Sequence, residues 1–108
     1  MATGTATLDF GALPGKSDAS VAVTGQGSIA SDSVVGAWVQ PTATADHLAD
    51  EHLVEGLRIY AGNIVAGTGF TIYGFHDHGG IESNDRADNA VVRDHFCWGR
   101  FTIAWAWV

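Results

Sequence analysis

Histidine and carboxylate side chains are the residues of this chain best suited to metal chemistry, and they fall in two groups. The first candidates are His47 and His52, with Asp46, Asp50 and Glu51 between or beside them; the second are His76 and His78, which flank Asp77. A catalytic zinc ion needs three such ligands and an open position. The five-residue step between the first two histidines is one residue longer than in H-E-x-x-H or H-x-x-E-H. Solvent-exposed polar loops with an acidic bias explain the pattern better than a zinc or calcium site, so we expect neither a metal nor another cofactor.

A cysteine close to a histidine is a second chemical possibility. Cys97 follows His95 by two residues, so a regular strand would place both side chains on one face, as nucleophilic catalysis requires. A thiol within a run of aromatic residues is more often a small buried hydrophobic group. No G-x-S-x-G motif occurs, and we expect that the chain is not an enzyme.

Exposed aromatic rings could stack on a sugar or another ligand. The possible members of such a surface are Trp38, Tyr60, Tyr73 and Trp98. Packing in a hydrophobic core is the alternative for all four. Period-two alternation puts Trp98 on the side of Arg100 and opposite Trp105 and Trp107, which favours a cation–π contact or an interface position.

These side chains must be positioned by strands, and the clearest strand is the last one. Along residues 96–108, Phe101, Ile103, Trp105 and Trp107 alternate with smaller or more polar residues. Aromatic and β-branched residues at period two indicate a strand with one buried face. A strand this apolar must be inserted into a sheet, because it would otherwise be an adhesive edge.

Further strands are predicted over residues 5–10, 19–24, 34–40, 52–61 and 70–75, with shorter runs at 64–65 and 90–93. Residues 42–51 are predicted as a loop or short helix, and a helix that continues through Val54 and Leu57 is the competing prediction for the start of 52–61. Residues 76–94 are polar and predict a long surface loop, which contacts a partner or solvent. About seven or eight strands in 108 residues predict one all-β domain, an antiparallel β-sandwich or jelly-roll-like barrel.

The composition of the chain argues against two kinds of partner, nucleic acids and membranes. The formal net charge of −7 argues against a nucleic-acid ligand, which needs a basic surface. No apolar run approaches the roughly 20 residues of a membrane span, and the first residues lack the pattern of a signal peptide. Cys97 is the only cysteine, so no disulfide can form within the chain. We therefore expect a protein made in the cytoplasm, with neither membrane nor nucleic acid as partner.

Several phrases of the sequence resemble small structural proteins of tailed bacteriophages and prophages. They occupy residues 6–26, 45–47, 50–55 (DEHLVE), 61–73 (AGNIVAGTGFTIY) and 99–107 (GRFTIAWAW). The likeness spans most of the chain and excludes residues 76–94. The similar segments include no catalytic motif, so the resemblance assigns no site residue to this chain.

The resemblance implies a virion component made in the host cytoplasm. It would be a capsid decoration (cement) protein or a tail or fibre accessory protein, whose partners are the major capsid protein or tail proteins. Repeated self-complementary patches imply a homo-oligomer on the particle. Conceivable interface residues are Trp98, Arg100, Glu55 and Arg58. A soluble carbohydrate- or metal-binding module is the alternative from another class.

Overall fold

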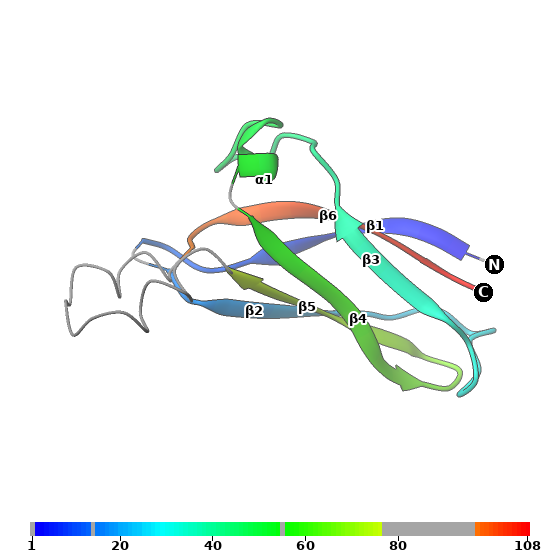
Figure 1. The fold of residues 1–108 in the computed structure, drawn as a ribbon. Helices are drawn as coiled ribbons and strands as arrows, with labels where there is room; N and C mark the ends of the chain where they lie inside the picture. Colours follow the sequence, from blue (N-terminus) through cyan, green and yellow to red (C-terminus); the bar gives the residue numbers. More distant parts are fainter. Residues whose placement is uncertain (1, 14, 55, 77–96) are drawn as a thin grey trace.

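Six strands and one short helix make up the part of the chain that the structure, a computed structural model, describes: residues 2–13, 15–54, 56–76 and 97–108 (Figure 1). The elements are β1 (Ala2–Asp9), β2 (Asp18–Val23), β3 (Val35–Val39), α1 (Glu51–Val54), β4 (Leu57–Val65), β5 (Gly69–His76) and β6 (Arg100–Trp107). Within these ranges no helix is long and apolar enough to cross a membrane.

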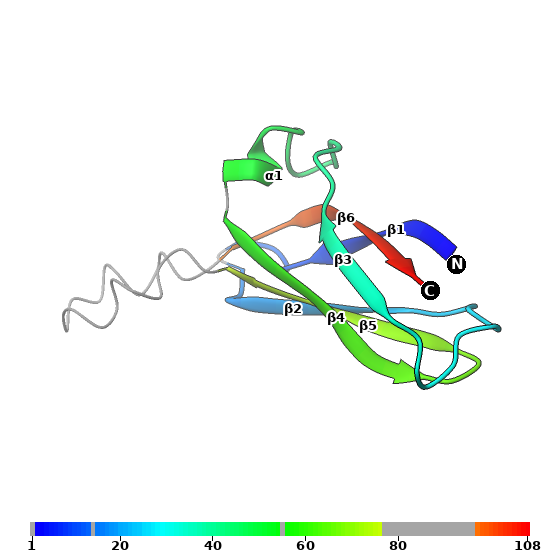
Figure 2. The same ribbon diagram turned by 45° about the vertical axis from the view of Figure 1, so that its right-hand side comes forward.

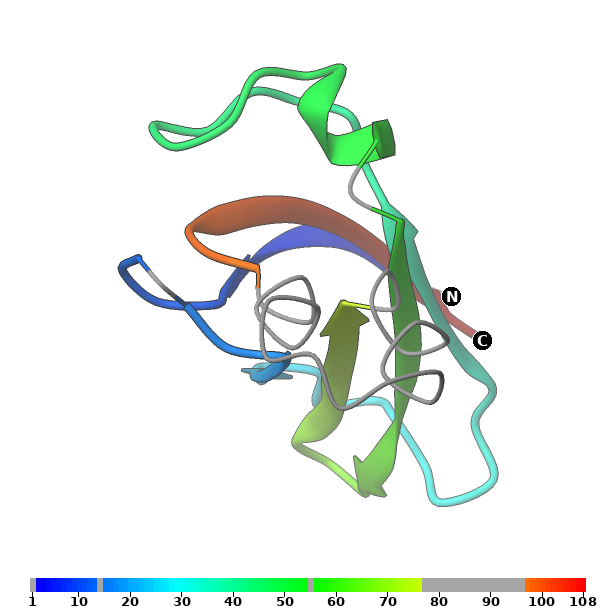
Figure 3. The same cartoon turned by 60° about the vertical axis from the view of Figure 1, so that its left-hand side comes forward.

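The strands form two antiparallel three-stranded sheets. The first has the order β1-β6-β3 and the second the order β2-β5-β4. In Figures 1 and 2, β1 and β6 lie above β2 and β5, and Figure 3 shows β3 and β4 next to each other along one side of the molecule. The prediction that the C-terminal strand lies within a sheet is confirmed, because β6 pairs with β1 on one side and β3 on the other. The barrel form of the prediction is wrong for the described residues, where the strands stay in two separate sheets.

The predicted alternation of β6 is observed. Phe101, Ile103, Trp105 and Trp107 are all buried, while Arg100 at the start of the strand is exposed. Their side chains meet buried residues of the second sheet, so one hydrophobic core is shared by both sheets. The other members are Leu8, Phe10, Ala19, Val23, Ile29, Phe70, Ile72 and Cys97. An edge-to-face contact between Phe70 and Trp105, with ring centroids 5.5 Å apart, is one contact between the sheets.

Two glycines leave room for this packing. A Cβ atom on Gly4 would come within 2.5 Å of the indole of Trp105, and one on Gly74 would collide with Leu8. Gly4 faces Trp105 across the β1–β6 pair, so the indole covers the backbone of β1. A side chain at either position would have to displace a buried group in a close-packed interior.

The strand boundaries near the middle of the chain differ from the prediction. The strand expected over residues 52–61 begins only at Leu57, because residues 51–54 form α1. The separate run expected at 64–65 is the end of β4, which continues past a bulge between Gly62 and Val65. Asn63 has a φ of 52° there, the left-handed conformation that asparagine tolerates best after glycine. The merger of the 64–65 run into β4, together with the 90–93 run lying outside the described residues, accounts for six strands there instead of seven or eight.

The final strand also starts later than expected. Gly99 has a φ of 81°, a conformation that breaks the extended backbone before Arg100. Upstream of it, Cys97 forms only an isolated bridge with Lys16. The predicted run at 90–93 and all of the long loop except His76 lie outside the described residues. His76 is the last residue of β5.

Candidate functional site

Side chains from the segment between β3 and β4 replace a missing strand along the edge of β6. Strand β3 pairs with β6 only as far as Val39 and Ile103, which leaves the backbone groups of Thr102 and Arg100 on that edge without a strand partner. The Gln40 N–H donates to the Thr102 carbonyl over 2.9 Å. The remaining three groups are satisfied by side chains, because buried or half-buried backbone groups need hydrogen-bond partners.

Those three side chains come from the predicted histidine and carboxylate region. Nε2 of His52 accepts a hydrogen bond from the Thr102 N–H over 3.1 Å. The Thr44 hydroxyl donates to the Arg100 carbonyl over 2.8 Å. A carboxylate oxygen of Asp46 accepts from the Arg100 N–H, also over 2.8 Å. The segment therefore continues the sheet without being a strand.

Thr44 also fixes the turn that carries these groups. Its hydroxyl oxygen accepts hydrogen bonds from the backbone N–H groups of Asp46 and His47, each over 3.2 Å. Its own N–H donates to the His47 carbonyl over 2.9 Å. This local hydroxyl-to-backbone pattern is typical of threonine at turns and helix entries. It aims the Asp46 carboxylate at β6.

The ring of His52 is held by both nitrogens. Nε2 accepts from a backbone N–H, so it carries no hydrogen, and Nδ1 donates to the Leu48 carbonyl over 2.9 Å. The two contacts define the tautomer from the backbone groups alone. With 1% of its surface exposed, His52 packs edge-to-face on Phe101. Both ring nitrogens of His52 are therefore occupied by hydrogen bonds within the fold.

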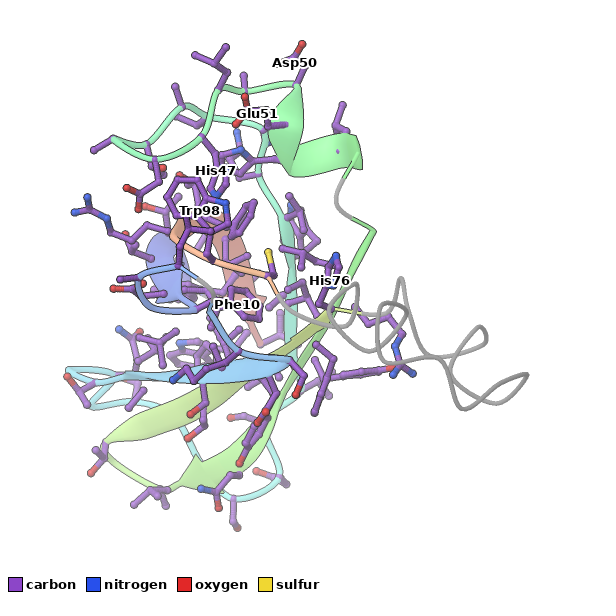
Figure 4. All side chains as sticks on the ribbon, turned by 90° about the vertical axis from the view of Figure 1, so that its left-hand side faces the viewer. Phe10, His47, Asp50, Glu51, His76 and Trp98 are labelled. Atoms are coloured by element: carbon purple, nitrogen blue, oxygen red, sulfur yellow. The ribbon has the colours of Figure 1, made fainter. Side chains whose placement is uncertain are left out.

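His47 is equally engaged. Nε2 donates to the Trp98 carbonyl over 2.7 Å, and Nδ1 lies 3.0 Å from a carboxylate oxygen of Glu51. The ring stacks on Phe101, with centroids 4.2 Å apart and an interplanar angle of 16°, and also contacts the Trp98 indole. Figure 4 shows His47 and Trp98 below Glu51, which is the first residue of α1. The contacts join α1 to the residues just before β6.

Arg100 and Asp46 form an ion pair within the chain. Nε of the guanidinium donates to the carboxylate of Asp46 over 2.9 Å, and a terminal nitrogen lies 3.5 Å from the second oxygen. These hydrogen bonds, together with the backbone N–H of Arg100, hold the pKa of Asp46 below its usual value. In return the carboxylate raises the pKa of Arg100. The pair supports the same junction as the two histidines.

The two groups of candidate metal ligands are not brought together in the described residues. His47 and His52 are neighbours, with ring centroids 6.5 Å apart, but all four ring nitrogens lie against protein groups. His76 lies apart from them at the end of β5 (Figure 4), Asp50 is exposed, and His78 lies outside the described residues. No group of three or more His, Cys, Asp or Glu side chains in this part of the chain could hold a metal ion.

Cys97 and the aromatic candidates are divided between core and surface. Cys97 is buried in the core, whereas His95 lies outside the described residues. Trp38 and Tyr60 are each half exposed, and Trp98 is half-buried against His47. The fourth candidate, Tyr73, is half-buried and faces Tyr60 across the β4–β5 pair. The four aromatic rings therefore do not form one platform.

The predicted interface residues have different surroundings. The guanidinium carbon of Arg58 lies 5.8 Å from the centroid of the Phe75 ring, a weak cation–π contact. Arg100 is committed to its ion pair, although about half of its side chain is exposed. Glu55 lies outside the described residues.

A groove that the sequence did not predict lies at the opposite end of the first sheet. It has a volume of about 230 Å³ and is lined by Val34, Val35, Gly36, Ala106, Trp107 and Val108. Gly36 faces Ala106 in the β3–β6 register. The sequence signal for this groove was the row of small residues on β6 opposite its bulky side chains. It could be recognised as a groove only once the register between β3 and β6 was known.

Comparison with known proteins gives no family assignment. A scan against models of protein families, a search of curated proteins and a search of solved structures each returned no match.

Proposed function

We propose that this chain is a non-enzymatic structural protein of a tailed-bacteriophage virion, most specifically a capsid decoration (cement) protein that binds the outer shell. Its partner would be the major capsid protein, and it would be made in the host cytoplasm and recur as a homo-oligomer on the particle. No catalytic step, cofactor, nucleic acid or membrane is part of the proposal. The proposed form is a β-sandwich used as a rigid binding unit.

One observation carries this proposal together with the resemblance. The side chains most capable of chemistry near α1 are used to complete the edge of β6: His52, Asp46 and Thr44 bind its backbone. A buried ring whose two nitrogens both serve the backbone contributes shape and stability. Such an arrangement supports a protein that acts through its surface.

The exposed surface supplies groups suited to protein contacts. Arg58 is exposed on β4 and Trp98 is half-buried before β6, and arginine and tryptophan are frequent at interface hot spots. The chain is acidic overall, so a basic patch on the shell would attract it over longer distances. A tail or fibre accessory protein would use the same surface chemistry and is the alternative within this class.

The proposal is tested by adding the purified chain to particles that lack it. We expect saturable co-sedimentation with capsids and a higher temperature of particle disruption. Binding to isolated tails alone would assign the chain to the tail. Binding to glycans with indifference to both would contradict the proposal and favour the carbohydrate-binding module, for which the half-exposed Trp38 and Tyr60 are the available rings.

A variant pair makes this assay specific. Arg58→Ala should weaken capsid binding severalfold while the unfolding temperature stays within about 2 °C, because an exposed position contributes little to stability. Lys16→Ala is the matched control, since Lys16 is also an exposed cation. Equal binding by both variants and the unaltered chain would remove Arg58 from the interface.

A further inference from the structure

The outer face of the first sheet is uncharged over most of its area. In the register of β1, β6 and β3 it carries Thr3, Thr5, Thr7, Gly36, Trp38, Thr102, Ala104 and Ala106, because alternate residues point to the same side of a strand. Charged side chains in this register come only at one end, where Asp9 faces Arg100. For a chain with a net charge of −7, this face is a neutral area.

A half-exposed indole lies next to two of the residues that line the groove on that face. Trp38 is 50% exposed and stands beside Ala104 in the register. Two residues earlier along β3, Gly36 and its register partner Ala106 line the 230 Å³ groove, as do the exposed Val34 and Val108. The distance along the strand from Trp38 to Gly36 is about 7 Å.

We propose that this face is a self-association surface, in which the Trp38 indole of one copy enters the Gly36–Ala106 groove of a second copy. A two-fold axis that lies in the plane of the interface and crosses β3 between Gly36 and Trp38 exchanges the indole and the groove. Both contacts then form at once, as in an isologous dimer. This dimer specifies the contact within the homo-oligomer of the proposed function. It rests on that function only for its location on a particle.

A second copy fits this face better than a partner of another kind because of charge and shape. Two acidic copies repel each other wherever their carboxylates meet, and this face keeps carboxylates out of the contact. Large and small residues on the same surface complement a rotated image of that surface. The row of threonines on β1 (Thr3, Thr5 and Thr7) places hydroxyl groups at the edge of the contact, like the polar rim of protein interfaces.

The contact is small, and that sets the expected affinity. Three strands spaced about 4.8 Å apart, each six residues long with a rise of about 3.3 Å per residue, give a contact area of roughly 300 Å² per copy, or about 600 Å² in total. Stable complexes bury about 1,200–2,000 Å². We therefore expect a dissociation constant of roughly 0.1–1 mM, which becomes effective when many copies are held close together on one surface.

The test is sedimentation equilibrium of the full chain at 0.02 to about 2 mM, a range chosen to span that affinity. Trp38→Ala should weaken dimerisation at least about tenfold, since aromatic anchors dominate interfaces. Tyr60→Ala is the matched control, because Tyr60 is equally exposed but lies on β4 of the other sheet. Equal weakening by both variants, or a monomer throughout for the unaltered chain, would overturn the proposal.

A second pair keeps the fold intact while the groove is filled. A Cβ atom on Gly36 meets nothing within 4 Å, and the same holds for Gly62 on β4. Gly36→Val should therefore fold and remain monomeric, whereas Gly62→Val should dimerise like the unaltered chain. Dimerisation by Gly36→Val would overturn the proposal. Dimerisation without capsid binding would refute the proposed function alone, and capsid binding by a chain that never dimerises would refute this inference alone.

Discussion

Replacing His52 tests whether a side chain truly substitutes for a strand at the edge of β6. In His52→Phe the ring and its packing on Phe101 are kept, but the Thr102 N–H loses its acceptor and the Leu48 carbonyl loses its donor. Leaving such a group unsatisfied costs about 1–3 kcal/mol, so we expect a loss of about 2 kcal/mol in the free energy of unfolding. For a domain of this size that corresponds to a decrease in melting temperature of roughly 8–16 °C.

Two further variants separate the hydrogen bond from the packing. His52→Gln keeps an acceptor of similar reach and should recover at least half of the loss. His52→Ala also removes the buried ring and should cost about 4 kcal/mol, because a cavity is added to the unsatisfied group. Leu53→Phe is the control, since Leu53 is on the same helix and 66% exposed, and should change stability by less than about 0.5 kcal/mol.

Urea unfolding followed by tryptophan fluorescence measures these values. We expect the stability to fall in the order unaltered chain, His52→Gln, His52→Phe, His52→Ala. A phenylalanine variant as stable as the unaltered chain would refute it, because the Thr102 N–H would then not depend on the histidine. Equal losses for His52→Gln and His52→Phe would show that the hydrogen-bond acceptor at this position does not account for the loss.

Three other perturbations follow from the same geometry. Gly4→Ala should destabilise the chain by about 1–3 kcal/mol, because the new methyl group meets Trp105, while Gly62→Ala, which meets nothing, should not; similar melting temperatures for the two would contradict the packing of β1. Asp46→Asn should lower the free energy of unfolding at neutral pH, and this loss should shrink as the pH falls below 3.8, the ordinary pKa of the carboxyl group. The reason is that a lowered carboxyl pKa gives stability that is present above that value and lost in acid. A loss that does not change with pH would exclude the ion pair with Arg100 as its cause. Dialysis against a chelator should leave the melting temperature unchanged within about 1 °C, since the buried histidine nitrogens serve the fold, and a stoichiometric metal whose removal lowers it would restore a metal site.

The alternation along β6 was predictable because it is local. Residues two apart share a side of a strand, so Phe101, Ile103, Trp105 and Trp107 had to face the same way whatever the partner strands were. The insertion of this strand into a sheet followed from its apolar character. The start of the strand was missed because it depends on one glycine, Gly99, whose positive φ is set by the surrounding packing.

The roles of the histidines could not be predicted because they depend on contacts between distant residues. His52 and Thr102 are 50 residues apart in the chain, and Thr44 and Arg100 are 56 apart. The sequence showed a histidine and carboxylate group but not that β3 ends early at Val39 and leaves backbone groups to be satisfied. The short helix was similarly uncertain, since four residues give too little periodicity to distinguish a helix from a strand.

The number of copies of this chain per purified virion, measured by quantitative mass spectrometry against the major capsid protein, tests the proposed role most directly. A shell decoration protein predicts copies in the hundreds, in a fixed ratio to the coat subunit. A handful or a few dozen copies would contradict the capsid assignment and place the chain in the tail. Its absence from purified particles would contradict a virion role altogether.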